Sequence, residues 1–339
     1  MNKHFFFPFS SVMATLLTSI SLGAQVLPDY QIAKTFRIGS AGGWDYIAVG
    51  PENNRLYVSH GNQVNILNEK SGDSVGVIAN TGGVHGIAFV TALGKGYTSN
   101  GRLNNITVFD LKTNQILGQI ATGQNPDAIM YEPYSKTIIT CNGRSNDLTV
   151  IDPVSEKILA TIAVGGKPET AVSDGAGKIY VNVEDKNEIV SINIKTNTVE
   201  KHWSVSPAEG PTGLAIDLVS KKLFAGCDKM LVVMDMVSGK VVDKLPIGDG
   251  CDGVAFDRNL KNIFASCGEG KLTIIHEDEK GKYTVVENLA TKKSARTIAI
   301  NEALHIVYLP AADLGTPAAG EKRAPMIPGS FQVLVVQAK

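Results

Sequence analysis

A unit of about 42 residues repeats seven times along this chain, and the repeat restricts the fold more than any other feature. Each unit opens with a short, mainly apolar stretch that has a polar residue at its second position. The seven openings are WDYIAV (44–49), VHGIAF (84–89), PDAIMY (126–131), PETAVS (168–173), PTGLAI (211–216), CDGVAF (251–256) and ARTIAI (295–300). A repeat of this length indicates one supersecondary unit that is stacked many times.

Each unit contains segments in which apolar and polar residues alternate, which predicts short β-strands. In the fourth unit the opening is followed by IYVNV, IVSIN and VEKHW, and residues typical of turns separate these segments. No stretch of the chain has a convincing helical periodicity. Four antiparallel strands in each of seven units predict an all-β fold, a seven-bladed β-propeller with four-stranded blades.

The last unit lacks a fourth strand of its own. It has two strands, a long insert and a third strand at 331–336. Residues 30–38 (YQIAKTFRI) precede the first unit and have the pattern of a strand. We therefore predict that this N-terminal strand completes the last blade, so that both chain ends pair in one sheet and the ring is closed.

Residues 1–24 lie outside the repeat and have the pattern of a secretory signal peptide. Lys3 supplies a positive charge, 12–22 is apolar, and small residues at 21–24 suit cleavage. We interpret 25–339 as a single propeller domain that is exported to the periplasm or the extracellular space. A transmembrane anchor is the alternative, but the apolar stretch is short and is interrupted by Thr and Ser.

The charge of the chain argues against two classes of partner. The 32 Lys and Arg residues nearly balance the 33 Asp and Glu residues, so no long-range attraction to nucleic acid or to an anionic membrane is expected. No later apolar run is long enough to span a bilayer. We expect a monomer whose partner is a small molecule, a peptide, a polysaccharide or another protein.

The segment KIYVNVEDKNEIVSINIKTNTVEK (178–201) and the units around it resemble the YVTN-repeat β-propellers. The resemblance covers essentially the whole chain after residue 24, at the level of blade pattern. It implies an exported or surface-layer type of propeller and no single activity. The turn that reads PDG in that family is retained only loosely here, as SDGAG (173–177).

One polar residue precedes the apolar core of each opening strand, and in a propeller these residues face a common axis. We call them the inner ring: Asp45, His85, Asp127, Glu169, Thr212, Asp252 and Arg296. Carboxylates and an imidazole in one ring can bind a divalent metal ion or supply a general base. The first candidates for a metal site are Asp45, His85, Asp127 and Asp252. Alternatively, these residues cap backbone amides or contact water in the channel.

Further candidate ligand-binding residues lie at or near the same face. Arg102 and Arg144 occur in a repeated N-G-R sequence between second and third strands, and two such residues can bind a carboxylate or a phosphate. Solvated turns are the alternative. His60 ends a second strand. Trp44 could stack on a ligand or cover the apolar rim.

Four cysteines, Cys141, Cys227, Cys251 and Cys267, are too few for a disulfide-built scaffold. Cys251 and Cys267 are expected side by side on paired strands, where they could form a disulfide or a thiolate metal site with Cys227. Because no C-x-x-C motif is present, buried free thiols are the preferred interpretation.

The insert at 311–330 is rich in Ala, Gly and Pro and is expected to lie over the ligand face, as a lid, a docking loop or a plain excursion.

Two functions remain open at this point. The first is an exported binding protein that recognises a small molecule, peptide, polysaccharide or partner protein on its loop face. The second is a metal-dependent lyase or lactonase built on the inner ring. Neither G-x-S-x-G nor H-E-x-x-H occurs, although propeller enzymes distribute their ligands over several blades. A divalent metal is the one cofactor that the residues suggest.

Overall fold

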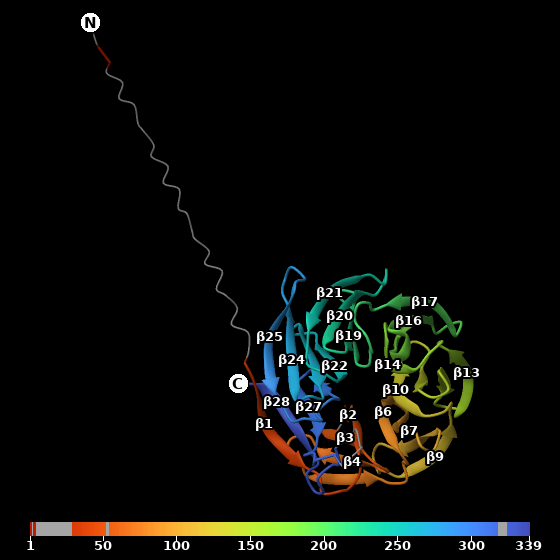
Figure 1. The fold of residues 1–339 in the computed structure, drawn as a ribbon. Helices are drawn as coiled ribbons and strands as arrows, with labels where there is room; N and C mark the ends of the chain where they lie inside the picture. Colours follow the sequence, from red (N-terminus) through yellow and green to blue (C-terminus); the bar gives the residue numbers. More distant parts are fainter. Residues whose placement is uncertain (2, 5–28, 52–53, 318–323) are drawn as a thin grey trace.

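The computed structural model describes residues 1, 3–4, 29–51, 54–317 and 324–339, whose strands form seven four-stranded antiparallel sheets in a ring (Figure 1). This confirms the predicted seven-bladed propeller. The predicted signal peptide lies outside these residues, apart from positions 1, 3 and 4. Within the described part of the chain, no helix is both long and apolar enough for a membrane crossing.

The first six blades are meanders that run from the axis of the ring outwards (Figure 1). Blades 1 to 3 contain β2 (Trp44–Val49), β3 (Arg55–His60), β4 (Gln63–Asn68), β5 (Ser74–Ile78); β6 (Val84–Val90), β7 (Lys95–Asn100), β8 (Asn105–Asp110), β9 (Ile116–Ala121); and β10 (Pro126–Glu132), β11 (Thr137–Asn142), β12 (Asp147–Asp152), β13 (Lys157–Ala163). Two short 3₁₀ helices, η1 (Thr91–Leu93) and η2 (Glu184–Lys186), lie in connections.

The next three blades repeat this order. They contain β14 (Pro168–Ser173), β15 (Lys178–Val183), β16 (Glu188–Asn193), β17 (Thr198–Ser204); β18 (Leu214–Asp217), β19 (Lys222–Cys227), β20 (Met230–Asp235), β21 (Val241–Pro246); and β22 (Cys251–Asp257), β23 (Asn262–Cys267), β24 (Lys271–Glu277), β25 (Tyr283–Ala290).

Blade 7 joins both ends of the chain, as the sequence predicted. Its strands are β26 (Ala299–Asn301), β27 (Ile306–Ala311), β28 (Gln332–Ala338) and β1 (Tyr30–Arg37). β1 pairs antiparallel with β28 from Tyr30 opposite Ala338 to Arg37 opposite Gln332. Tyr30 and Phe36 are buried, so the closing strand contributes side chains to the core as well as backbone hydrogen bonds.

The turn between the third and fourth strands explains part of the repeated sequence. The Asp110 carboxylate accepts hydrogen bonds from the backbone N–H groups of Lys112 and Thr113, and Asn114 follows with a left-handed φ of 62°. Asp235 receives equivalent bonds in blade 5. Asp and Asn favour such turns because their short side chains bond to the nearby backbone. The Asp that ends the third strand of these two blades is therefore structural.

The core lies between neighbouring blades. Leu56 and Val58 of blade 1, for example, pack with Val333 and Val335 of blade 7. Tyrosines of second strands add hydrogen bonds that reach the next blade: the Tyr308 hydroxyl donates to Glu69. Because the blades pack against one another and are joined by hydrogen bonds, they form a rigid frame on which the loops at the axis can vary in sequence.

Candidate functional site

All seven inner-ring residues line one central cavity of about 920 Å³. Each blade supplies one of them, because each occupies the same position in its repeat unit. Other residues that line the cavity include Trp44, Tyr46, Lys167, Glu184, Leu314 and Met326. The sequence pattern thus brings residues that are up to 251 positions apart (Asp45 and Arg296) into one site.

A β-bulge lies at the ring position of five innermost strands. The register with the second strand shifts between Trp44 and Ile47 in β2, and equivalent shifts occur in β6, β10, β14 and β22. A bulge bends the strand and re-aims a side chain, and bulges are common beside functional sites. Thr212 and Arg296 lie just before β18 and β26, outside the paired strands.

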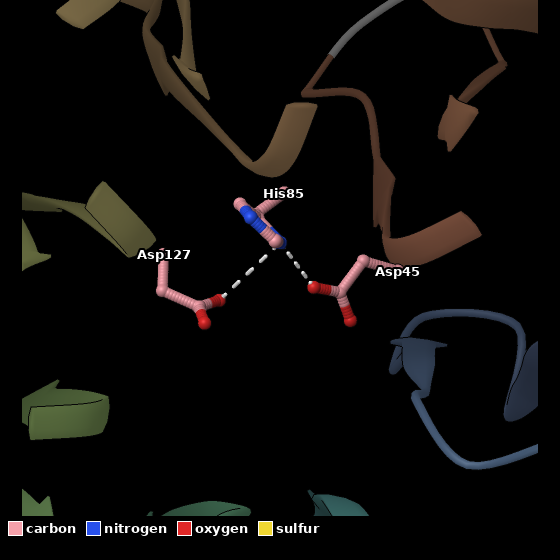
Figure 2. Close-up of side chains that lie close together, drawn as sticks. All are labelled: Asp45, His85 and Asp127. Carbon is pink, nitrogen blue, oxygen red and sulfur yellow. Dashed lines mark hydrogen bonds and ion pairs between the residues drawn. The ribbon is translucent and has the colours of Figure 1, made fainter. Parts of the chain in front are cut away.

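Asp45, His85 and Asp127, from three consecutive blades, converge on one point (Figure 2). His85 Nδ1 lies 2.6 Å from Asp45 Oδ2 and 3.8 Å from Asp127 Oδ1. Both Asp side chains are 15% exposed and the imidazole is 26% exposed. Asp127 Oδ1 is buried and has no hydrogen-bond partner among the described residues. One nitrogen and two carboxylates therefore face a shared space.

Asp252 stands apart from these three residues. Arg296 Nε lies 2.5 Å from Asp252 Oδ2, and Arg296 Nη2 lies 3.2 Å from Asp45 Oδ1. The guanidinium thus holds the two carboxylates from blades 6 and 1. The sequence suggested four metal ligands, and the structure brings only three of them together. Asp252 pairs with Arg296 and does not lie beside His85.

Lys167 is a site residue that was not predicted from the sequence. It pairs with Glu169 (Nζ to Oε1, 2.7 Å) and with Glu184 from η2. A signal was present. Lys167 lies two positions before its ring residue, and it is the only charged residue at this position of the seven units. The others are Gly43, Gly83, Asn125, Gly210, Gly250 and Ser294.

The electrostatics of the cavity are dominated by carboxylates. Burial and the charge of Asp45 raise the pKa of Asp127 to about 7, and burial and the charge of Asp127 raise the pKa of Glu169 to about 8. Burial lowers the pKa of His85, but the hydrogen bond to Asp45 and the charge of Asp127 outweigh it, so that this pKa is raised. Among the lining residues, five carboxyl groups face two cationic side chains.

Two aromatic side chains form part of the cavity wall. The Trp44 ring packs against the buried ring of Phe331, with centroids 5.3 Å apart. Tyr46 is half-buried and also borders a smaller cavity of about 150 Å³, which residues of β2, β6, β10, β11 and β14 line. Trp44 therefore packs over the apolar rim, which was one of its two expected roles, and it also lines the central cavity.

His60 is a correction to the candidate list, because it is fully buried. Its Nδ1 lies 2.6 Å from Ser40 Oγ and its Nε2 lies 2.7 Å from the carbonyl oxygen of Gly42. The ring stacks on Phe331 at 4.0 Å between centroids. With both nitrogens engaged, His60 supports the wall of the site and does not reach the cavity.

Arg102 and Arg144 are exposed and do not line the cavity. The Asn residues of the two N-G-R sequences have a structural role instead. Asn100 Nδ2 donates to Asn105 and to Thr107, and Asn142 repeats this pattern in blade 3. The Asn residues of the N-G-R sequences therefore stabilise the repeat, whereas the two arginines are exposed outside the cavity.

All four cysteines are buried free thiols. Cys251 and Cys267 lie opposite each other on β22 and β23, as the pattern predicted. The neighbouring Cys267 side chain, together with burial, raises the pKa of Cys251 well above its usual value, so this thiol is a poor nucleophile.

The described parts of the 311–330 insert lie over the cavity. Leu314, Ala324 and Met326 line it, and Leu314 forms an isolated bridge with Met326. This agrees with the predicted position, while residues 318–323 lie outside the described residues.

Comparisons with known proteins agree on the fold alone. No protein-family model matches the chain, and no curated protein matches it either. A search of solved structures matches a chain described as Kuenenia stuttgartiensis hydrazine synthase, with a TM-score of 0.71 and 16% identity over 85% of this chain and 95% of that chain. The chain is thus a seven-bladed β-propeller, and its likeness to the YVTN-repeat propellers stays a resemblance.

Proposed function

We propose that the protein binds a small polar molecule in its central cavity and acts as a binding protein. The observation that carries the proposal is that every blade directs one ring residue into a single cavity. Its volume of about 920 Å³ falls in the range of small-molecule sites, about 300–1,000 Å³. A polysaccharide or a protein partner would fit an open surface better than this partly covered space.

The lining suggests the chemistry of the ligand. The carboxyl groups outnumber the cationic side chains, and Lys167 and Arg296 are each shared by two carboxylates. A ligand with amino or hydroxyl groups can donate to the remaining acceptors, and the edges of Trp44 and Tyr46 can pack against its apolar atoms. The fold match does not favour the lyase or lactonase alternative over binding.

The test is a thermal-shift and calorimetry screen with polyamines, amino acids, amino sugars and small saccharides. We expect a compound that binds the wild-type chain and loses about tenfold affinity in Glu184→Gln, because a hydrogen bond to a charged group contributes about 1.5–3 kcal/mol. Glu200→Gln is the control, since Glu200 pairs with Lys178 outside the cavity. Equal losses in both variants, or saccharide binding that Glu184→Gln leaves unchanged, would contradict the proposal.

We also propose that the chain is exported, on the basis of the signal-peptide pattern in residues 1–24. N-terminal sequencing of protein recovered from the periplasm or medium of an expressing bacterium should give an N-terminus near residue 25. Recovery from the cytosol alone, with Met1 retained, would argue against export.

A further inference from the structure

We propose that Asp45, His85 and Asp127 bind one divalent first-row transition-metal cation, of the type of Zn²⁺ or Mn²⁺, in the central cavity. The inference rests on the proposed function in that the ion forms part of the ligand-binding surface, but the ion itself binds without an organic ligand. Each residue offers one ligand atom, and these atoms lie within 4.8 Å of one another. Figure 2 shows the three side chains pointing into the same space.

The donor set selects the class of ion. One imidazole nitrogen and two carboxylate oxygens suit Zn²⁺ and Mn²⁺, whereas Ca²⁺ and Mg²⁺ prefer sites made of oxygen alone. Three protein ligands leave further coordination positions free. Because the cluster lines a cavity of about 920 Å³, these positions face space that water or a ligand can occupy.

The buried carboxylate of Asp127 also indicates a cation at this cluster. Its Oδ1 is buried without a hydrogen-bond partner among the described residues, and a buried carboxylate oxygen is costly unless it is paired. The nearby cationic side chains are engaged elsewhere: Lys167 pairs with Glu169 and Glu184, and Arg296 pairs with Asp252 and with Asp45 Oδ1. Among the described residues, Asp127 Oδ1 is therefore a buried acceptor beside His85 that receives no hydrogen bond from a cationic side chain.

Arg296 and the loop after β7 orient the other two ligands. By holding Asp45 Oδ1, Arg296 leaves Oδ2 turned towards His85. A Cβ atom on Gly101 would lie 2.6 Å from His85 Nε2, which is too close for any real contact. The missing side chain of Gly101 thus gives the imidazole the room to keep Nδ1 towards both carboxylates, and Gly101 acts as a positioning residue.

The repeat supplies a matched control for Gly101. Gly143 is the equivalent glycine of the second N-G-R sequence, and the nearest atom to its Cβ position lies 3.6 Å away, an ordinary contact. Neither glycine has a positive φ. Gly101→Ala should therefore displace His85, whereas Gly143→Ala makes the same chemical change without affecting the cluster.

The experiment is a calorimetric titration of chelator-treated full chain with Zn²⁺, Mn²⁺, Ca²⁺ and Mg²⁺, with the bound metal counted by elemental mass spectrometry. We expect one Zn²⁺ or Mn²⁺ per chain and weaker binding of Ca²⁺ and Mg²⁺. Loss of an outer-shell partner typically lowers metal affinity about 10–100-fold, so Gly101→Ala should lower it about tenfold and Asp127→Asn more. Gly143→Ala and Glu200→Gln, which lies outside the cavity, should keep the wild-type Kd.

Specific results would overturn the inference. These are no Zn²⁺ or Mn²⁺ binding, a Kd for Asp127→Asn equal to that of the wild type, or tighter binding of Ca²⁺ than of Zn²⁺. Equal effects of the two glycine variants would remove the role of Gly101. Thermal unfolding of every variant shows whether it is folded. Small-molecule binding by the chelator-treated chain would support the proposed function even if no ion bound. Ion binding without any small-molecule binding would support the metal site and contradict the proposed function.

Discussion

A chain that begins at Ser40 instead of Asp29 is expected to lose the cooperative unfolding transition of the propeller. The shorter chain lacks β1, which pairs along β28 and buries Tyr30 and Phe36, and it lacks the buried Ile38. Full burial of one such side chain contributes about 1.5–3 kcal/mol. The free energy lost with these three side chains and with the backbone pairing approaches the whole net stability of a typical protein, about 5–15 kcal/mol.

Removal of β1 also leaves β28 as an open sheet edge, so aggregation is expected on heating. Calorimetry and size-exclusion chromatography of the two chains measure both effects. The chain that begins at residue 29 is the control, and a synthetic peptide of residues 29–39 should partly restore the transition of the shorter chain. A shorter chain that melts cooperatively at the control temperature would show that the ring does not depend on this closure.

The fold could be predicted because its determinants are local and repeated. Alternating apolar residues define each strand, and the seven openings fix the number of blades. Even the exchange of β1 into blade 7 follows from a missing fourth strand at one end and an unassigned strand at the other. The opening strand predicted for unit 7 at 295–300 is shorter in the structure, where β26 has only three residues.

Only those features of the site that follow from the symmetry of the repeat could be predicted. Equivalent positions in equivalent blades must face the same axis, which is why the inner ring lines one cavity. The partners within the ring depend on side-chain length and direction, which a repeat does not encode. Lys167 was missed because it lies outside the ring position, and only its long side chain brings its ammonium group to Glu169 and Glu184 of the same blade. His60 was misassigned because Ser40 and Phe331, which enclose it, come from opposite ends of the chain.

Phe331 connects the stability of the chain with the geometry of the site. Its ring is fully buried, and it contacts both His60 and Trp44. The backbone carbonyl of Trp44 in turn accepts a hydrogen bond from Arg296, the residue that holds Asp45. A void at Phe331 would therefore loosen the wall that positions one member of the Asp45–His85–Asp127 cluster.

Phe331→Ala is expected to lower the free energy of unfolding by about 3–5 kcal/mol, the usual cost of removing a buried aromatic ring. Urea denaturation of the variant measures this loss. Phe331→Leu fills more of the space and should lose clearly less. Because the void lies behind Trp44, the Ala variant should also bind Zn²⁺ more weakly than the Leu variant while it is still folded. Equal stabilities of the two variants would mean that the surrounding residues fill the space at position 331. The position of Trp44 would then not depend on the Phe331 ring.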